Sequence, residues 1–330
     1  MIKVALDAMG GDHAPAEVVL GATRAVTQMP VHVLLVGQPD ELHRELKKLK
    51  FLNHPHLTVV PAAEVVGMAE SPSMSYRRKK ESSIRVGLDL VKAGQADGFL
   101  SAGNTGAVLL TATMVLGKIK NIDRPAVATV IKAETGPMVM LDMGTNVDCR
   151  PSHLEQFALM GHFYSKLVLD IPEPRVALLS IGEEVEKGNE LTQAAYKLIE
   201  TLPLKFIGNI EGKDIMKGTA DVIVCDGFVG NVLLKFGEGL VEFFIDFFQK
   251  AYRESWRNRI GLMLLMKTLR KFKKQFDYQE TGGAPLLGVD GVCFIAHGKS
   301  KSVAIYNGIR TVCHAVEGEM VQRIAQQVGQ

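Results

Sequence analysis

The sequence has few aromatic residues, few cysteines and no large excess of charge of either sign. Aromatic residues make up 6% of its 330 residues, too few to predict a surface on which single-stranded nucleic-acid bases would stack. The formal net charge of +2 gives no sign of a nucleic-acid-binding surface. We therefore expect no nucleic-acid partner.

Its four cysteines form no Cys-x-x-Cys pair and match no zinc-ligand spacing. They indicate reduced thiols in a cytoplasmic protein. The first residues, MIKVALDAMGG, contain no apolar stretch followed by a cleavage site, so no signal peptide is expected. A run of about 18 uncharged apolar residues is also missing, which predicts that no helix spans a membrane.

Three motifs of common enzyme classes are absent. Without a Gly-x-Gly-x-x-Gly turn and a later acidic residue, a dinucleotide site of the Rossmann type is not expected. Without a Gly-x-Ser-x-Gly turn, a Ser-His-Asp hydrolase is not expected. The aspartates that follow strands do not have the spacing of metal ligands, so a two-metal phosphatase is poorly supported.

Short apolar runs alternate with helical patterns along most of the chain. This alternation predicts an α/β fold with a mostly parallel, doubly wound sheet. Residues 117–126 are expected to form a hinge or an edge crossing. The expected strands are Lys3–Leu6, His32–Val36, Leu57–Pro61, Gly98–Ser101, Ala126–Ile131, Met138–Asp142, Arg175–Ser180, Lys205–Asn209 and Val222–Cys225. The expected helices include Val18–Thr27, Glu41–Leu49, Ile84–Lys92, Ser152–Leu167 and Leu191–Thr201.

Five of these strands end in polar segments that contain glycine. Carboxyl ends of parallel strands meet at one edge of a sheet, where backbone N–H groups can bind phosphate, so we expect one shared crevice. The five segments are DAMGGDHAP (residues 7–15), SAGNTGA (101–107), LDMGTNV (141–147), SIGEEVEKGNE (180–190) and CDGFVGNV (225–232).

The first two segments are candidates for binding phosphate through the backbone. In the first, Gly10 and Gly11 would supply N–H groups and His13 a charge or a hydrogen bond. A structural turn in which His13 caps the next helix is the alternative. In the second, Asn104 and Thr105 lie at a helix start, where Asn104 can instead be only a helix cap.

The last two segments are candidates for stabilising charge. Lys187, followed by Asn189, can neutralise a phosphate or an oxyanion, although a lysine in a loop is usually only solvated. Asn231, which follows Asp226, can donate its amide to an oxyanion; the alternative is a helix cap.

Two basic segments lie outside these strand ends. The first contains Arg77, Arg78, Lys79 and Lys80, and is either a mobile lid that meets an acidic partner or phosphate, or a solvated loop. The second follows a helical stretch at Leu240–Tyr252 and is basic and apolar. It predicts a protruding helical hairpin at about residues 240–278, with an apolar tip near Gly261–Met266. Such a hairpin suits a membrane surface, a dimer interface or burial.

These segments, together with RRKKESS (77–83), IDRPA (122–126), GGAPLLGV (282–289) and AHGKS (296–300), resemble the phosphate acyltransferase family of the PlsX type. The resemblance extends from Ile2 to about Arg310. It implies one catalytic domain over residues 1–330, an α/β/α sandwich similar to phosphotransacetylases and isocitrate dehydrogenase-like enzymes. It also implies that acyl-acyl carrier protein and inorganic phosphate react to give acyl-phosphate for phospholipid synthesis.

The resemblance further implies a cytoplasmic homodimer at the inner face of the membrane, without a metal or nucleotide cofactor. A membrane glycerol-3-phosphate acyltransferase would be its downstream partner. The important lysine and asparagine of the family fall on Lys187 and Asn231. Ser180 stands where the family commonly has Asn, and Thr145 where it has Ala, which affects fine positioning.

Together these inferences give a candidate site. Phosphate attacks the thioester directly, Lys187 and Asn231 serve the oxyanion or the phosphate, and His13 orients phosphate or protonates the leaving thiolate. The basic segment at residues 77–80 binds the carrier protein, and Leu262, Leu264 and Leu265 enter the membrane. The residues expected to bind phosphate or substrate are Asp7, Gly10, Gly11, Asn104, Thr105, Asn146, Asn189 and Asp226.

Two other interpretations remain open from the sequence. A related enzyme on the same scaffold would be a phosphotransacetylase acting on short acyl-CoA, or a decarboxylating dehydrogenase. A protein of another class would be a non-catalytic scaffold at the membrane surface, although a scaffold has no need of a crevice suited to phosphate.

Overall fold

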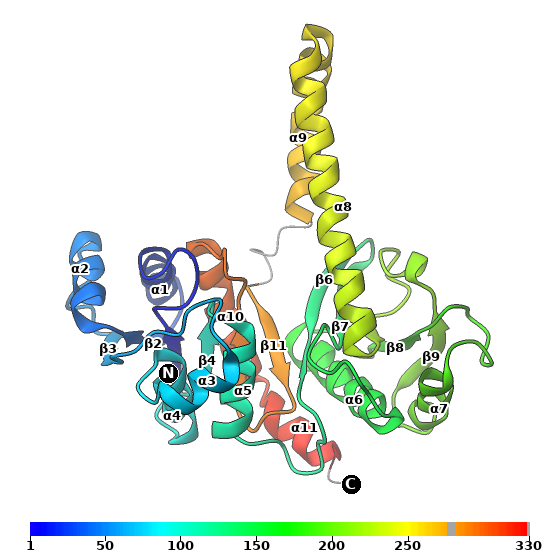
Figure 1. The fold of residues 1–330 in the computed structure, drawn as a ribbon, viewed down its shortest axis with the longest axis horizontal. Helices are drawn as coiled ribbons and strands as arrows, with labels where there is room; N and C mark the ends of the chain where they lie inside the picture. Colours follow the sequence, from blue (N-terminus) through cyan, green and yellow to red (C-terminus); the bar gives the residue numbers. More distant parts are fainter. Residues whose placement is uncertain (276–281, 329–330) are drawn as a thin grey trace.

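The structure, a computed structural model, describes residues 1–275 and 282–328 and arranges its strands in two sheets flanked by helices (Figure 1). The expected α/β fold with mostly parallel strands is confirmed. The strands are divided, however, between a sheet in an N-terminal lobe and a sheet in a C-terminal lobe. The expected strand at Ala126–Ile131 is two strands, one in each sheet, so the chain crosses between the lobes at Ala128.

The N-terminal lobe contains a seven-stranded sheet in the order β3-β2-β1-β4-β12-β11-β5. Only β11 runs antiparallel to its neighbours. The last two strands of the chain, β11 and β12, were not expected from the sequence, and they lie between β4 and β5. The bounds are β1 Ile2–Asp7, β2 Val31–Gly37, β3 Leu57–Pro61, β4 Gly98–Ser101, β5 Ala126–Val127, β11 Ala284–Leu287 and β12 Val292–Ile295.

Helices cover both faces of this sheet because alternate residues of its strands are apolar on both sides. Val4 and Leu6 pack with α1 and α10, whereas Ala5 packs with α4 and α5. The bounds are α1 Ala16–Gln28, α2 Pro39–Leu49, α3 Pro72–Arg78, α4 Ser83–Lys92, α5 Thr105–Val115 and α10 Ser302–Glu317.

The C-terminal lobe contains a five-stranded sheet in the order β6-β7-β10-β8-β9, in which only β6 is antiparallel to its neighbour. Its two main helices are α6 and α7, and a short 3₁₀ helix spans Gly212–Asp214. The bounds are β6 Thr129–Ala133, β7 Gly136–Leu141, β8 Arg175–Leu179, β9 Lys205–Ile210, β10 Val222–Val224, α6 Pro151–Val168 and α7 Glu190–Ile199.

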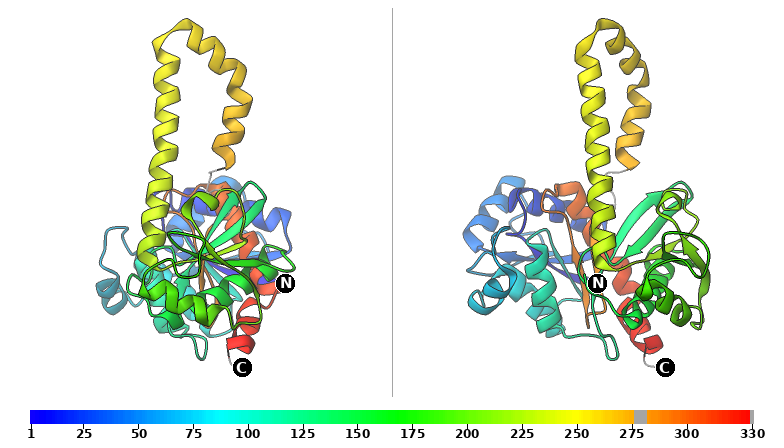
Figure 2. Two further views of the ribbon diagram at one scale, coloured as in Figure 1. Left: turned by 90° about the vertical axis from the view of Figure 1, so that its right-hand side faces the viewer. Right: turned by 45° about the vertical axis from the view of Figure 1, so that its right-hand side comes forward.

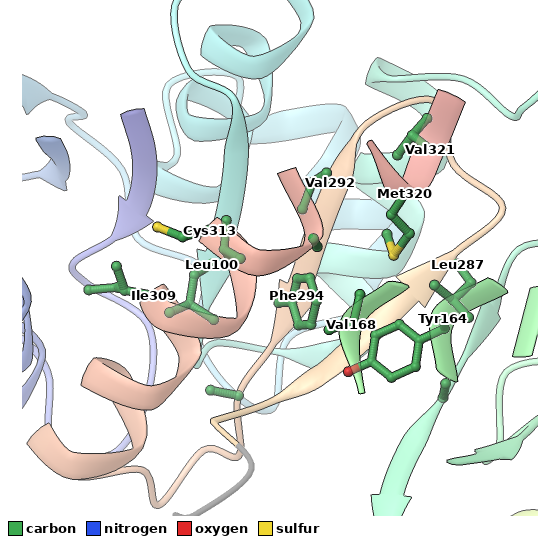
Figure 3. Close-up of a cluster of buried hydrophobic side chains, with 14 of the residues drawn as sticks. Leu100, Tyr164, Val168, Leu287, Val292, Phe294, Ile309, Cys313, Met320 and Val321 are labelled. Atoms are coloured by element: carbon green, nitrogen blue, oxygen red, sulfur yellow. The ribbon is translucent and has the colours of Figure 1, made fainter. Parts of the chain in front are cut away.

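A continuous hydrophobic core joins the two lobes (Figure 3). Tyr164 and Val168 of α6, in the C-terminal lobe, lie near Met320 and Val321 of α11 (Met320–Val328). Phe294 of β12 lies in the same cluster, and all five side chains are buried. The lobes are therefore fixed to each other through α6, α10 and α11.

Two long helices, α8 (Gly227–Glu254) and α9 (Trp256–Gln275), project from the body (Figures 1 and 2). The turn between them is at Ser255, whose hydroxyl accepts a hydrogen bond from Asn258 N at 3.1 Å and so caps α9. The turn expected at Gly261–Met266 is therefore wrong. Leu262, Leu264 and Leu265 lie inside α9 instead of at the turn, and residues 276–278 of the expected hairpin lie outside the described residues.

The hairpin presents large apolar side chains to solvent. Leu264 is 81% exposed, and Phe236 and Trp256 are 68% and 67% exposed. Only the first turns of α8 reach the core of the C-terminal lobe, through Leu233 and Leu234. In the part of the chain that the structure describes, no helix is long and apolar enough to cross a membrane.

Because the core between α6, α10 and α11 joins the lobes, truncating a side chain in it should lower the stability of the protein substantially. Met320→Ala should lower the free energy of unfolding by about 2–5 kcal/mol, because it leaves a cavity between α11 and α6. Met114→Ala changes a methionine that is 57% exposed and should alter stability by about 0.5 kcal/mol or less. Urea denaturation measures both values. Equal losses in the two variants would contradict the importance of this core.

Candidate active site

The first part of the site lies where β1 and β4 are neighbours in the sheet. The helices that follow these strands, α1 and α5, cover opposite faces, so the strand ends form a topological switch point, the place at which such sheets bind ligands in a crevice. The two glycine turns predicted from the sequence meet here. A Cβ atom on Gly10 would lie 2.7 Å from Gly103 N, so the turns touch backbone to backbone. The predicted meeting of these two strand ends is confirmed.

The carboxylate of Asp7 holds both turns through hydrogen bonds. Its Oδ2 accepts a hydrogen bond from Ser101 Oγ at 2.6 Å, and its Oδ1 accepts one from Met9 N at 3.1 Å. Ser101 Oγ in turn accepts from Gly103 N at 3.0 Å. Burial raises the pKa of Asp7 above its usual value, although these hydrogen bonds lower it. Because Asp7 is 1% exposed, it shapes the crevice and does not reach a ligand in it.

A third loop, AHGKS after β12, completes this rim. Asp12 N donates a hydrogen bond to Gly298 O at 2.8 Å. Gly11 lies beside the same carbonyl with φ of 103°, a conformation that favours glycine. No separate role was predicted for this loop from the sequence. Its polar, glycine-bearing residues after an apolar run were the available signal, but the strand before it was not recognised.

Asn104 is used inside the protein. Its Oδ1 accepts from Ala107 N at 3.0 Å and caps α5, as the structural alternative predicted. Its Nδ2 donates to the carbonyls of Met68 and Glu70, each at 2.9 Å. The side chain of Asn104 therefore does not bind phosphate. Thr105 is exposed at the first position of α5, where backbone N–H groups have no acceptor within the helix.

His13 is exposed on the loop between β1 and α1. Pro15 is the N-cap residue of α1, and no side-chain hydrogen bond caps the helix there. The side chain of His13 therefore does not cap α1. The pKa of Glu17 is lowered chiefly because its carboxylate accepts a hydrogen bond from Ser302 N at 2.7 Å, and the charge of His13, one turn earlier, lowers it further.

In the C-terminal lobe, Asp142 has the position that Asp7 has in the other lobe. It is buried at the end of β7 and accepts hydrogen bonds from Thr145 N at 3.2 Å and Asn146 N at 2.6 Å. Asn146 Nδ2 donates to Pro125 O at 2.8 Å, and Asn146 O accepts from Gly227 N at 2.8 Å. Asn146 therefore ties the start of α8 to the crossing between the lobes, and its amide is not free for substrate.

The start of α8 presents Asn231 to the space between the lobes. Asp226 caps the helix by accepting from Val229 N at 2.9 Å. Asn231 is exposed in the second turn and lies against Gly144, where an added Cβ would be 3.3 Å from Asn231 Cγ. Burial lowers the pKa of His297 in the loop after β12; the charge of Glu238, two turns further along α8, raises it, and that of Lys235, one turn further along, lowers it. This side of α8 therefore faces the N-terminal lobe.

Lys187 and Asn189 lie on the loop after β8, the strand next to β10. Lys187 is exposed, and Asn189 caps α7 by accepting from Thr192 N at 2.9 Å. Asn209 Nδ2 holds the loop by donating to Glu184 O at 2.8 Å. Among the contacts of the described residues, none joins Lys187 to Asn231. Lys187 lies on a loop and Asn231 in the second turn of α8, and both follow neighbouring strands of the same sheet.

The basic segment at residues 77–80 begins in α3 and is not uniform. Lys79 turns inward, where its Nζ donates to Val65 O at 2.6 Å and pairs with Glu70 at 2.5 Å. Arg77, Arg78 and Lys80 are exposed. Across residues 1–275 and 282–328, no group of three or more His, Cys, Asp or Glu side chains is placed to hold a metal ion.

Comparison with known proteins decides the family. Residues 2–323 match the family described as fatty acid synthesis protein. A phosphate acyltransferase of Heliobacterium modesticaldum is 47% identical over 327 residues, covering 99% of this chain and 98% of the relative. The chain belongs to the phosphate acyltransferase family. A phosphate acyltransferase of Nostoc punctiforme, 46% identical over 329 residues, covers 99% of this chain and 96% of its own.

The fold of this family member is also that of solved phosphotransacetylases. One from Streptococcus pyogenes has a TM-score of 0.66 at 20% identity and covers 96% of this chain and 94% of its own. A branched-chain phosphotransacylase from Enterococcus faecalis has a TM-score of 0.59 at 15% identity and covers 96% and 99%. The predicted fold class and family are confirmed. The chain is an acyltransferase whose reaction involves phosphate.

The raised pKa of Asp7 predicts a pH dependence of stability. Between the usual value of 3.8 and the raised pKa, the folded state binds more protons than the unfolded state. The contribution of Asp7 to stability therefore increases as pH falls through this window. Asp7→Asn keeps an acceptor for Met9 N but does not titrate. The unfolding free energy of the wild type minus that of Asp7→Asn should rise from pH 7 to about pH 4 in urea denaturation.

Asp7→Ala is the matched control for the hydrogen bonds. It leaves buried donors without an acceptor and should cost about 1–3 kcal/mol of stability at pH 7. A difference between the wild type and Asp7→Asn that does not change with pH would contradict the titration of this carboxyl group.

Proposed function

We propose that this acyltransferase moves a fatty acyl group from acyl-acyl carrier protein to inorganic phosphate, by direct attack of phosphate on the thioester. The supporting observation is that the two glycine turns meet at Gly10 and Gly103, and that none of the four cysteines is an activated thiol. Burial raises the pKa of Cys149 to about 11, and the pKa values of Cys225, Cys293 and Cys313 are raised by burial as well. Such thiols are poor nucleophiles near pH 7.

The crevice between β1 and β4 would bind phosphate. The turn containing Gly10 and Gly11 lies beside the start of α5, where Thr105 is exposed. Backbone N–H groups and the positive end of a helix favour an anion in this position. Small residues allow the ligand to approach the backbone closely. His13, on the loop between β1 and α1, would orient the phosphate.

The chemistry then needs stabilisation of charge on the acyl carbonyl. A phosphate oxygen forms a bond to the thioester carbon, and the carbonyl oxygen becomes an oxyanion. The carbon–sulfur bond then breaks, and the leaving thiolate receives a proton, for which His13 is the candidate donor. Lys187, on the loop after β8, and the amide of Asn231, in α8 after β10, are exposed in the other lobe and would stabilise the oxyanion.

The exposed surfaces suit the partners of this reaction. Arg77, Arg78 and Lys80 would bind an acidic carrier protein. The hairpin of α8 and α9 exposes aromatic and aliphatic side chains beside basic ones, which suits a second copy of the chain and the cytoplasmic face of the membrane. There the enzyme would supply acyl-phosphate to a membrane glycerol-3-phosphate acyltransferase.

The decisive experiment incubates the purified enzyme with palmitoyl-acyl carrier protein, with and without inorganic phosphate. We expect free carrier protein and acyl-phosphate only when phosphate is present. Release of carrier without phosphate would show a thioesterase and overturn the proposal. Turnover of acetyl-CoA alone would show a short-chain phosphotransacetylase instead.

The same assay tests the charge-stabilising residues. Lys187→Ala and Asn231→Ala should each lower kcat by about 100- to 1000-fold, the usual loss when one oxyanion donor is removed. Lys197→Ala removes an exposed lysine from α7 and should leave kcat unchanged. If both site variants keep near-normal turnover with unchanged thermal unfolding, the assignment of Lys187 and Asn231 is wrong.

The hairpin makes a separate prediction. Changing Leu262, Leu264 and Leu265 together to Glu should weaken binding to anionic liposomes by about 100-fold or more, because their apolar area leaves the lipid. The control carries the same three charges at exposed polar positions of the hairpin: Gln249→Glu, Asn258→Glu and Thr268→Glu. Co-sedimentation measures both variants. Equal binding by the two would show that these leucines are not the membrane contact.

A further inference from the structure

A segment between β3 and α4, residues 62–82, lies beside the phosphate crevice, and we call it the strap. It contains α3, which packs against α5 (Figure 1). One side chain, Asn104, joins the strap to the start of α5. Its Nδ2 donates to Gly67 O at 3.3 Å and to Met68 O and Glu70 O at 2.9 Å each, and the residue is 8% exposed. Two amide hydrogens thus serve three carbonyl groups of the strap.

The strap is itself held together as a unit. Glu70 Oε1 accepts from Gly67 N at 3.1 Å and pairs with Lys79 Nζ, while Glu70 Oε2 accepts from Ser75 Oγ at 3.1 Å. Lys79 Nζ also donates to Val65 O at 2.6 Å. These bonds fix Lys79 inward, so the exposed cations of α3 are held in one orientation relative to the residues that Asn104 binds.

The strap also touches two elements of the crevice directly. A Cβ on Gly298, in the loop after β12, would lie 2.7 Å from Met68 Cε. A Cβ on Gly106, in the first turn of α5, would lie 2.7 Å from Pro72 Cγ. The strap therefore rests on the same loop and the same helix start that border the glycine turns.

We propose that Asn104 is a positioning residue, which holds the basic surface of α3 at a fixed place beside the phosphate crevice. A carrier protein bound to Arg77, Arg78 and Lys80 then presents its thioester to the bound phosphate. This inference rests on the function proposed above and adds a specific role to it. Asn104 acts through the strap and does not touch substrate.

The two roles of the Asn104 amide, the Oδ1 cap of α5 and the Nδ2 hydrogen bonds to the strap, can be tested separately. Asn104→Asp keeps the oxygen that caps α5, because Asp and Asn are equally good caps, but it places a carboxylate against the strap carbonyls. Asn104→Ser keeps a cap and removes the reach to the strap, and serves where the Asp variant does not fold. Both variants should speed hydrogen exchange at residues 67–70, because they remove the bonds that hold these residues to α5.

The decisive readout compares two acyl donors at saturating phosphate: palmitoyl-acyl carrier protein, and a short-chain acyl-pantetheine thioester that has no carrier protein. For the carrier donor, we expect Asn104→Asp to lower kcat/KM by about tenfold or more, through KM. For the small donor we expect a change of less than about twofold. The double variant Arg77→Glu/Arg78→Glu should show the same loss with the carrier donor only. Adding Asn104→Asp to it should lower kcat/KM by less than the product of the two separate effects, because both changes act on the same docking step.

The outcomes separate this inference from the function on which it rests. Equal losses with both donors would show that Asn104 supports the chemistry or the fold, and would overturn the positioning role. No loss with either donor would overturn it as well. A wild-type enzyme that forms acyl-phosphate from neither donor would overturn the proposed function itself.

Discussion

The candidate site depends on two carboxyl groups that are buried at the ends of parallel strands. Asp7 ends β1 and Asp142 follows β7, one in each lobe, and each accepts hydrogen bonds from the glycine turn that comes after it. Burial makes the charged form unfavourable, and the pKa of both groups is raised. Without these acceptors, buried N–H and O–H groups of the turns would be unsatisfied, at a greater cost. The buried acids therefore fix the shape of the loops, and exposed neighbours are left to meet the substrate.

The sequence predicted the strand ends well because their signals are local. An apolar run followed by glycine and polar residues identifies a strand that enters a turn, and the five predicted segments all lie at carboxyl ends of strands. The division into two sheets was not predicted, since Ala126–Ile131 is a mostly apolar run that contains no glycine or proline to mark a change of sheet at Ala128. The insertion of β12 beside β4 depends on pairing between residues far apart in the sequence, such as Gly98 and Val292, which no local pattern contains. The loop AHGKS was missed as part of the site for that reason.

Sequence could not separate caps from ligands, because the same residue types serve both. Asn104, Asn189 and Asp226 each follow a strand and precede a helix, and all three are caps in the structure. Thr105, Lys187 and Asn231 lie close to them in sequence and are exposed. The same ambiguity misplaced the turn of the hairpin. The tip was expected near Gly261–Met266, whereas Ser255 caps α9 through its hydroxyl and the helix begins at Trp256. Only the geometry shows which polar atoms are already bound.

The long helix α8 connects the site to the hairpin. It begins at the cap Asp226 and carries Asn231 in its second turn; its 28 residues give a length of about 42 Å. Only its first turns, through Leu233 and Leu234, pack into the core, so the outer part is not stabilised by the body. A helix pair with this much exposed apolar surface gains stability when another surface covers it. The orientation of Asn231 against Gly144 is set at one end of this helix, and a partner that covers the hairpin acts on the other. Helix α8 therefore carries both the exposed apolar surface that a partner would cover and the proposed catalytic amide of Asn231.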